Sequence, residues 1–561
     1  MATFSELFTP KLITVLREGY GLGAFRSDLM AGLTVAVVAL PLSMAIAIAS
    51  GATPAQGLYT AIIGGFFVSL LGGSRFQIGG PAGAFIVLVA ATALQHGMDG
   101  LILATAMSGL FLAAAGFLRL GTYVKFIPYP VTVGFTAGIA VIIFASQVKD
   151  LLGLSPDAAE PGPIVEKLPF LWDNLPTFGV WAIIVSVGSV ALILGLRHYR
   201  PSWPGMLIAV AAAALLAGLF HLPVDTIGTQ FGGIPSGLPV PALPEITLAK
   251  MQAVFPAAAS FALLGSIESL LSAVVADGMT GRRHRSNCEL VAQGVANMAS
   301  ALFGGICVTG TIARTATNVR AGAHGPIAGI MHAMFLLLFI LVAAPLAAYI
   351  PLAALAGVLA VVAWNMIERD AIATLLRSNW GEASVLSVTF LLTIFRDLTE
   401  AIVVGFALGS VLFINRMSKV TSIETDTPFV SVDKADSAVA DLTPFDEEAA
   451  ADPDVVIYRI RGAFFFGAAA SIGAVLDRIS DSSRALIIDL SAVPFVDSTA
   501  AMTIESLAKK TAKKGVHLIL IGTSHELRKE LFSHGIKPPL VRIEANLDLA
   551  LRHARHDLEG H

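Results

Sequence analysis

The chain has few charged residues, and the deficit is not evenly spread. Only 14% of its 561 residues are Asp, Glu, Lys or Arg, whereas soluble globular proteins carry about 25%. Charges are sparse from Leu29 to Ile414 and frequent from Lys419 onward. This change predicts a membrane domain over 28–418, preceded by a short segment at 1–27 and followed by a linker and soluble domain over 419–561.

Cysteine is nearly absent too, and basic residues are not in excess. Cys288 and Cys307 are the two cysteines, which cannot form a disulfide framework and lack the spacing of metal ligands. The formal net charge is −4, so the composition does not favour nucleic-acid binding. The sequence offers no nucleophile–base set and no metal cluster. We therefore expect neither an enzyme nor a bound metal or cofactor.

Long apolar runs are abundant. Their number predicts about fourteen membrane segments, of spanning or half-spanning length. They fall at 29–50, 55–73, 81–95, 101–118, 127–147, 178–196, 203–221, 253–276, 289–303, 311–320, 325–348, 351–367, 383–395 and 398–415. If the N-terminus is cytoplasmic, the outer loops of this region hold only Lys149, Lys167, Lys250 and Arg396 among its basic residues. This asymmetry obeys the positive-inside rule and predicts that both termini are cytoplasmic.

Two glycine-rich stretches interrupt the apolar pattern at corresponding places in the two halves of the membrane domain. The first runs from Gly72 to Ala84 and the second from Gly304 to Arg314. Each begins with Gly-Gly, continues through a short extended run and leads into a helical pattern. Broken hydrophobic segments at matching positions indicate a transporter's binding site, and a half-helix directs its unpaired N–H groups at an anion. The pattern therefore predicts an anion carrier.

Glu268 is an isolated carboxylate in the middle of an apolar run. Ionisable groups inside a membrane are costly and are commonly functional. Desolvation favours the neutral form of a carboxyl group, so we expect Glu268 to take up and release a proton during transport. The alternative is a structural ion pair or hydrogen bond, for which Arg314 is the candidate partner.

Arg314 follows Gly310 by one helical turn in the second broken segment. It is predicted either to contact an anionic substrate or to neutralise Glu268, and an Arg–Glu pair that opens for the substrate would do both. The hydroxyl and amide groups of Ser43 and Gln77 are weaker candidates for the same site.

The C-terminal part has the pattern of an α/β domain. Strands are predicted at 455–460, 485–490 and 516–521, and helices at 468–479 and 498–514. Strands that alternate with helices predict a mainly parallel sheet. The turn Asp497-Ser498-Thr499-Ala500 places hydroxyl groups at the start of the second helix. It is expected to cap that helix, and phosphate binding is the alternative.

Together these motifs resemble the sulfate permease (SulP) family of anion transporters. The resemblance rests on Gln-Ile-Gly-Gly-Pro-Ala-Gly-Ala at 77–84, on 262–281 around Glu268 and on Thr-Gly-Thr-Ile-Ala-Arg at 309–314, and it covers nearly the whole chain. The tail is similar to the STAS domain of that family. Within the family, the chain looks most similar to bacterial C4-dicarboxylate carriers of the DauA type.

The resemblance implies an all-α polytopic membrane domain followed by a cytoplasmic α/β STAS domain. The membrane domain would be a seven-plus-seven inverted repeat with two half-helices, working by an elevator-like cycle in a homodimer of the bacterial inner (plasma) membrane. Glu268 would match the acidic residue linked to cation coupling. The predicted substrate-binding set is Ser43, Gln77, Ala82, Gly83, Ala84, Thr311, Ile312 and Arg314. Ser498 and Thr499 are the predicted regulatory residues of the STAS turn.

Two positions depart from the family pattern. Ser272 stands where a sodium-driven bicarbonate carrier of this family would have a second carboxylate, which favours protons over sodium as the coupling ion. Ala500 replaces the usual glycine of the STAS turn, which puts regulation by phosphorylation there in doubt.

The sequence thus predicts a proton-coupled secondary transporter of sulfate, bicarbonate or C4-dicarboxylates. A nucleobase–cation symporter shares the architecture, but it normally has a carboxylate where Arg314 stands and has no STAS tail. An anion channel is the other alternative, against which saturable uptake would argue.

Overall fold

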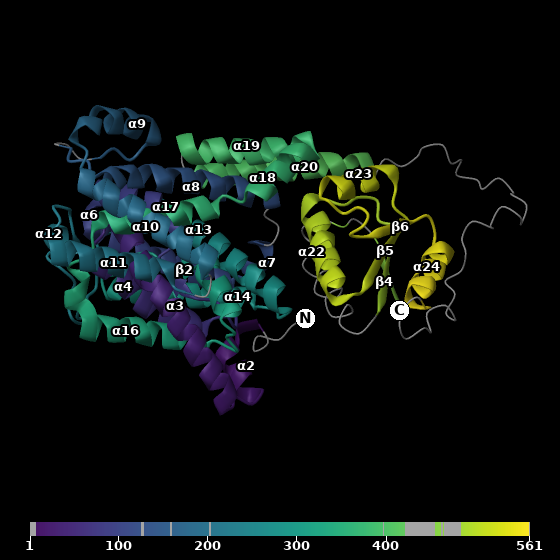
Figure 1. The fold of residues 1–561 in the computed structure, drawn as a ribbon, viewed down its shortest axis with the longest axis horizontal. Helices are drawn as coiled ribbons and strands as arrows, with labels where there is room; N and C mark the ends of the chain where they lie inside the picture. The colour runs from purple at the N-terminus through teal and green to yellow at the C-terminus, as the bar shows by residue number, and fades with distance from the viewer. Residues whose placement is uncertain are drawn as a thin grey trace, which may run out of the picture. The chain divides into compact units, whose positions relative to one another are not determined.

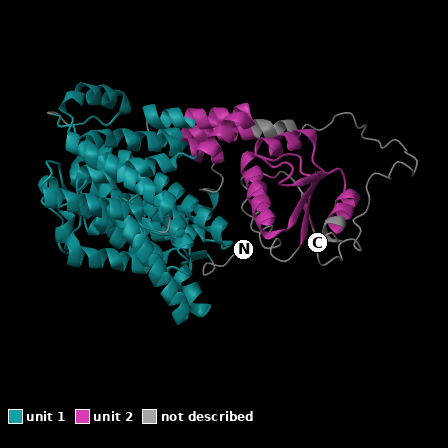
Figure 2. Cartoon of the chain, viewed as in Figure 1, with its two compact units in different colours: residues 1–125, 135–368, 389–402 teal, residues 126–134, 369–388, 403–561 magenta. Residues whose placement is uncertain are grey.

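The computed structural model describes residues 7–124, 128–156, 160–200, 203–396, 398–420, 455–461, 464 and 484–559. The chain forms two compact units (Figure 2). The first comprises residues 1–125, 135–368 and 389–402, and the second comprises 126–134, 369–388 and 403–561. The second unit therefore contains part of the helical sequence as well as the C-terminal α/β fold.

The first half of the helical sequence contains long helices interrupted by one very short strand (Figure 1). Its elements are α2 (Lys11–Arg17), α3 (Leu22–Ala49), α4 (Pro54–Tyr59), the π-helix η1 (Thr60–Gly64), α5 (Gly65–Leu71), β1 (Gly79–Gly80), the 3₁₀ helix η2 (Gly83–Phe85), α6 (Ile86–Phe117), α7 (Gly121–Val124), α8 (Tyr129–Leu152), α9 (Ile164–Asp173), η3 (Leu175–Thr177), α10 (Val180–Tyr199), α11 (Gly205–Phe220) and α12 (Ile227–Phe231).

Helix α6 consists of two helices joined at Gly97, whose φ of 71° lies in the left-handed region. Glycine adopts this conformation because it has no Cβ. The part before Gly97 corresponds to the half-helix predicted at 81–95, and the part after it to the span predicted at 101–118.

The second half repeats the motif of a short strand followed by a helix. Its elements are α13 (Leu248–Thr280), α14 (Ser286–Leu302), β2 (Thr309–Gly310), α15 (Ile312–Arg320), α16 (Ile327–Ala347), α17 (Leu352–Met366), α18 (Arg369–Ser378), α19 (Trp380–Phe395) and α20 (Leu398–Val420). Helices α6 and α14 cross at Gly109 and Gly294, where a Cβ on either residue would lie 2.6 Å from the other's carbonyl oxygen. Such contacts let helix backbones approach closely.

Every apolar run predicted from the sequence coincides with helix in the structure. Within the described residues, eight helical segments are long and apolar enough to cross a membrane, and three shorter apolar helices accompany them. The sequence did not predict α2, α9 or α18. They are too short or too polar to register as membrane segments.

The C-terminal fold is a four-stranded parallel sheet of order β3-β4-β5-β6. Its strands are β3 (Val455–Arg461), β4 (Ala485–Ala492), β5 (His517–Ile521) and β6 (Arg542–Glu544), and its described helices are α22 (Ser498–Lys514), α23 (His525–Ser533) and α24 (Leu547–Glu559). Apolar residues are buried in two separate clusters of this fold. The predicted strands, parallel sheet and second helix are confirmed, whereas the helix predicted at 468–479 lies outside the described residues.

Candidate functional site

The two glycine-rich stretches meet in the structure. Strands β1 and β2 pair antiparallel, with Gly79 opposite Gly310 and Gly80 opposite Thr309. The pairing continues where Thr311 N donates to Ile78 O at 3.0 Å. The two breaks, which the sequence places in different halves of the chain, therefore form one structural feature.

We call the stretch from Gly72 to Ala84 the first arm, the stretch from Gly304 to Arg314 the second arm, and the place where β1 pairs with β2 the crossing. Glycine is required at the crossing because each arm makes room for a side chain of the other arm. A Cβ on Gly80 would lie 2.2 Å from Arg314 Nη1, and a Cβ on Gly310 would lie 1.7 Å from Gln77 Nε2. Arg314 is 1% exposed, and its Nη2 donates to Pro81 O at 3.2 Å. Arg314 and Gln77 thus fill the spaces that the glycines leave.

Polar side chains of α14 hold both arms. Asn297 bonds to both backbone groups of Val308, since its Nδ2 donates to the carbonyl oxygen at 2.8 Å and its Oδ1 accepts from N–H at 2.9 Å. Glu289 accepts from Ser74 N at 3.0 Å at the start of the first arm. The hydropathy pattern of the sequence did not distinguish these residues from their neighbours. The available signal was the spacing of four between Glu289, Gln293 and Asn297, which places all three on one helix face.

Each arm is also held by a side chain from the other half of the membrane domain. Thr315 Oγ1 of α15 accepts from Ile78 N at 3.1 Å. Thr60 Oγ1 of η1 accepts from Ile306 N at 2.8 Å. Buried backbone groups must be paired to avoid a large desolvation cost, so these contacts let non-helical backbone persist inside a helical unit.

Two helix N-termini begin at the crossing. Helix α15 starts after Thr311, and η2, which continues into α6, starts after Ala82. Neither of these cap residues accepts a side-chain hydrogen bond from its helix. The first N–H groups of a helix have no partner within the helix, so both starts can donate to an anion. A Cβ on Gly83 would lie 3.0 Å from Ile143 Cδ1 of α8 and 3.8 Å from Met366 Sδ of α17, which identifies the facing wall as apolar.

Glu268 lies on α13 between two contacts of this helix, one with the second arm and one with α15, which continues that arm. One turn before it, Gly265 O accepts from Thr309 Oγ1 at 3.2 Å, and one turn after it, Ser272 Oγ donates to Thr315 Oγ1 at 3.0 Å. Glu268 is half-buried, and its Oε2 has no hydrogen-bond partner among the residues that the structure describes.

Glu268 and Arg314 form no ion pair with each other, as far as the described part of the chain shows. The Nε and Nη1 atoms of Arg314 are buried and, like Oε2 of Glu268, have no hydrogen-bond partner in the described structure. In this conformation the guanidinium is bonded to Pro81 rather than to the carboxylate.

The other predicted residues differ in their burial and in their hydrogen bonds. Ser43 is fully buried, and its hydroxyl donates to Ala39 O of its own helix at 2.7 Å. Within the described part of the chain, both amide atoms of Gln77 are buried without a hydrogen-bond partner. Ala84 is buried beside the start of α6, whereas Ile312 is 36% exposed at the start of α15.

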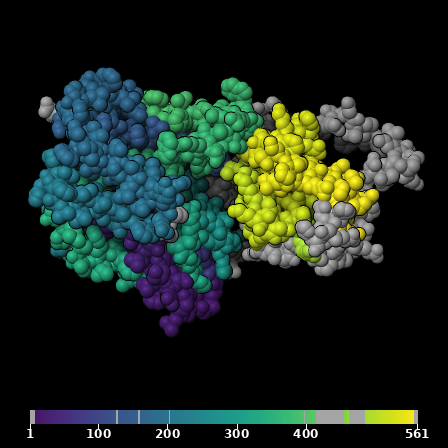
Figure 3. All heavy atoms as spheres, in the orientation of Figure 1, coloured from purple at the N-terminus to yellow at the C-terminus, as the bar shows by residue number. Residues whose placement is uncertain are grey.

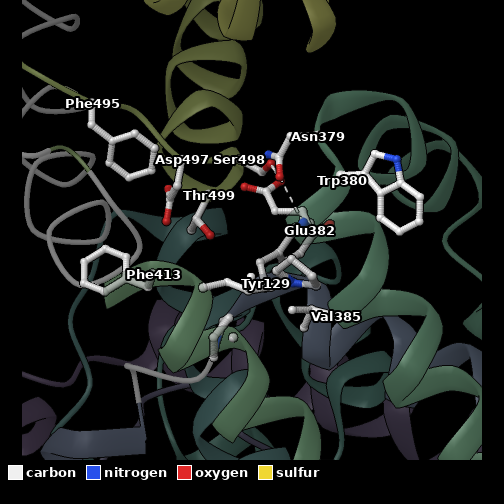
Figure 4. Close-up of a pocket in the computed structure, with 15 residues that line it drawn as sticks. Tyr129, Asn379, Trp380, Glu382, Val385, Phe413, Phe495, Asp497, Ser498 and Thr499 are labelled. Carbon is white, nitrogen blue, oxygen red and sulfur yellow. Dashed lines mark hydrogen bonds between the residues drawn. The ribbon is translucent and has the colours of Figure 1, made fainter. Parts of the chain in front are cut away.

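Ser498 and Thr499 lie in the second unit, at the start of α22. They line a pocket of about 460 Å³ together with side chains such as Tyr129 and Glu382 (Figure 4). Ser498 Oγ donates to the Glu382 carboxylate. The cap of α22 is Asp497, whose Oδ1 accepts from Ala500 N at 2.9 Å. The turn therefore caps the helix through its carboxylate rather than through a hydroxyl.

Sequence profiles agree with this architecture. The profile of the Sulfate permease family matches residues 25–389, and that of the STAS domain matches residues 447–550. The chain belongs to the sulfate permease family. It is 40% identical to the putative sulfate transporter YvdB of Bacillus subtilis, over 92% of this chain and 95% of that protein. It is 32% identical to the bicarbonate transporter BicA of Picosynechococcus, over 90% of each.

Solved structures of related proteins have the same fold. The transmembrane domain of a cyanobacterial bicarbonate transporter BicA superposes with a TM-score of 0.63 at 33% identity, covering 68% of this chain and 98% of that one. SLC26A9 superposes with a TM-score of 0.67, covering 99% and 94% of the two chains, and at 18% identity it shows the fold alone. The relatives are named as transporters, which confirms a multi-pass membrane anion transporter rather than an enzyme.

Proposed function

We propose that this sulfate permease family member is a secondary active transporter that carries a small oxyanion together with a proton. The crossing of β1 and β2 is the observation that supports this function, because two uncapped helix N-termini begin there. Each helix N-terminus stabilises an anion by about 0.3–2 kcal/mol. A substrate held between them would be bound mainly by backbone N–H groups of η2 and α15.

Arg314 supplies the positive potential behind this site. Its guanidinium lies against Gly80 and donates to Pro81 O, so it also orients the peptide that leads into Ala82 and Gly83. In the conformation described, Arg314 therefore acts on the anion indirectly, by orienting the first arm. Direct contact between Arg314 and the anion would require a different conformation of its side chain.

Glu268 couples the anion to a proton in this proposal. An anion at the crossing and an ionised Glu268 would repel each other strongly in a low-dielectric environment. Protonation of the carboxyl removes that repulsion, so anion and proton bind together and leave together. The transporter is then a symporter.

Sodium is not the favoured coupling ion. Ser272 offers no charge, and its hydroxyl is engaged with Thr315. The described residues therefore give a sodium ion only one carboxylate near the second arm, that of Glu268, which suits a proton better.

Sulfate and bicarbonate are the first substrate candidates, because the relatives named above are a putative sulfate transporter and a bicarbonate transporter. C4-dicarboxylates follow from the resemblance of the sequence motifs. Purified protein in liposomes, with one labelled anion and many unlabelled competitors, separates these candidates. Saturable uptake that oxyanions inhibit supports the proposal, whereas inhibition by nucleobases alone or non-saturable flux supports a symporter of another class or a channel.

The assembly and domain organisation are proposed as well. Residues 28–418 would form the transport domain, with 1–27 and 419–561 in the cytoplasm of a homodimer in the bacterial inner membrane. Within the transport domain, a core would move against a gate in an elevator-like cycle. Labelling of single cysteines in cells with a membrane-impermeant thiol reagent tests the location of the termini. Cross-linking of the purified full-length protein tests the dimer.

A further inference from the structure

The N-terminal helix α2 is attached firmly to the rest of the first unit. Val15 is 1% exposed, and a Cβ on Gly325 would lie 3.1 Å from its Cγ1. Glu18, just after the helix, forms an ion pair with the buried Arg75. Figures 1 and 3 show this purple N-terminal segment at the surface of the first unit. The helix is therefore a fixed part of that unit.

The attachment brings two cations from distant elements to neighbouring backbone carbonyls. Lys11 N donates to Gly72 O at 2.9 Å, and Arg285 N donates to Gly73 O at 2.9 Å. Arg285 Nη1 also donates to Thr9 O at 2.8 Å, in the segment before α2. The same Nη1 donates to Thr14 Oγ1 at 2.9 Å, so the guanidinium of Arg285 lies against the segment that carries Lys11.

The negative charges near these cations already have partners. Glu18 is bonded to Arg75, and the Asp277 carboxylate is 2.7 Å from His284 Nδ1. The ammonium group of Lys11 forms no ion pair or side-chain hydrogen bond among the described interactions. Glu289, whose carboxylate also lies at this loop, accepts from Ser74 N. Among the described residues, the half-buried ammonium group of Lys11 therefore has no acidic side chain as its partner.

The electrostatics of Lys11 agree with this arrangement. Burial lowers the pKa of Lys11 to about 8, with further lowering by Arg285 and Arg75, while Asp277 and Glu18 oppose the change less strongly. An anion at this place would offset the repulsion between the cations. It would bind best below pH 8, where Lys11 carries its proton.

We propose that Lys11 and Arg285 form a binding site for a phosphate group, separate from the transport site. Both side-chain hydrogen bonds that the structure gives Arg285 use Nη1, which leaves Nε and Nη2 to donate to phosphate oxygens beside Lys11 Nζ. Paired guanidinium donors match the geometry of such an oxyanion. The phosphate belongs either to a lipid headgroup or to a small soluble compound, and its binding clamps α2 to the loop between α13 and α14.

The test compares thermal unfolding of three full-length proteins: wild type, Lys11→Gln and the control Arg17→Gln. Arg17 is an exposed cation on the same helix, so its replacement removes an equal charge. One arm titrates inorganic phosphate against chloride at matched ionic strength. The other compares lipid nanodiscs that contain phosphatidylglycerol with nanodiscs of phosphatidylcholine.

Ligand should raise the unfolding temperature of wild type and Arg17→Gln alike. The half-maximal phosphate or lipid concentration should be at least about tenfold higher for Lys11→Gln, equivalent to about 1.4 kcal/mol. The wild-type response should also weaken between pH 7 and pH 9. Protection by phosphate alone identifies a soluble ligand, and protection by phosphatidylglycerol alone identifies a lipid.

Equal responses of all three proteins would overturn the proposal. That result would assign the effect to general electrostatics or to the transport site, neither of which distinguishes Lys11 from Arg17. Absence of any response in wild type to both ligands would overturn it as well. The outcome does not depend on which anion is transported.

Discussion

Arg314 donates a hydrogen bond from Nη2 to the carbonyl oxygen of Pro81 at 3.2 Å, and so joins the second half-helix to the first arm. The contact is possible because Gly80 has no side chain. A Cβ at that position would lie 2.2 Å from Nη1 of the same guanidinium. One residue pair thus connects the two halves of the chain and places a positive charge directly behind the proposed anion site.

Gly80→Ala is therefore expected to displace Arg314 and to reduce anion affinity by about as much as loss of that side chain does. Substrate binding to purified protein measures the effect. Gly310→Ala is the matched control, because its Cβ would displace Gln77 instead of the cation. A comparable loss in Gly310→Ala would show that distortion of the strands or displacement of Gln77 reduces the affinity as much as displacement of Arg314 does, and would contradict the special role of Arg314.

Arg314→Ala should weaken anion binding by about one to two decades, because it removes the positive charge behind the site and the hydrogen bond from the guanidinium that orients Pro81. A hydrogen bond that involves a charged group contributes about 1.5–3 kcal/mol. Arg314→Lys should recover only part of this loss, because lysine lacks the planar donor fork. Since Arg314 and Glu268 form no ion pair in the described structure, the effects of Arg314→Ala and Glu268→Gln on anion affinity should be additive in a double-mutant cycle. Full rescue by the second substitution would instead identify Arg314 as the counter-ion of Glu268.

The segments that form the crossing could be predicted from the sequence, because glycine spacing and apolar runs are local signals. The half-helix at 81–95, the helix at 311–320 and the parallel sheet of the C-terminal fold all follow from such patterns. The contact of Arg314 with Pro81 does not, because it depends on which face of the strand the guanidinium occupies after folding. The sequence indicated the substrate or Glu268 as the partner of the Arg314 side chain, and a backbone carbonyl was not among these alternatives.

The polar residues of α14 that hold the two arms could not be identified from the hydropathy of the sequence alone. Asn297 and Glu289 lie in a run that was interpreted only by its hydropathy, although their regular spacing on α14 indicated a polar face. Ser43 was a candidate as a hydroxyl in an apolar helix, and the structure gives that hydroxyl a partner in its own helix. A single polar residue in an apolar run therefore indicates a polar contact without showing whether the contact is to ligand or to backbone.

Asn297→Ala should destabilise the protein strongly. It removes two hydrogen bonds to Val308 and leaves buried backbone groups unpaired, a loss of about 2–5 kcal/mol. Denaturant unfolding in mixed micelles measures it, with Asn365→Ala as control, since Asn365 bonds Arg197 in an exposed contact. Equal stability of the two variants would contradict the role assigned to Asn297 in holding the second arm.

Replacement of external sodium by potassium should leave uptake unchanged, because Ser272 is uncharged and hydrogen-bonded to Thr315. Ser272→Ala should lower stability slightly and should not introduce dependence on sodium. Initial rates in liposomes at constant pH and membrane potential check both statements. A steep sodium dependence of the wild-type rate would refute proton coupling and favour a sodium-driven mechanism.

Proton coupling through Glu268 is best tested with Glu268→Gln, since this substitution keeps the shape of the side chain and fixes it in the uncharged form. The measurement is accumulation of the labelled anion in liposomes under an imposed inward proton gradient, with anion exchange in the absence of a gradient as the internal control. Wild type should accumulate the anion, whereas Glu268→Gln should exchange it without accumulating it. Accumulation by Glu268→Gln at the wild-type rate would contradict the assignment of Glu268 as the proton carrier.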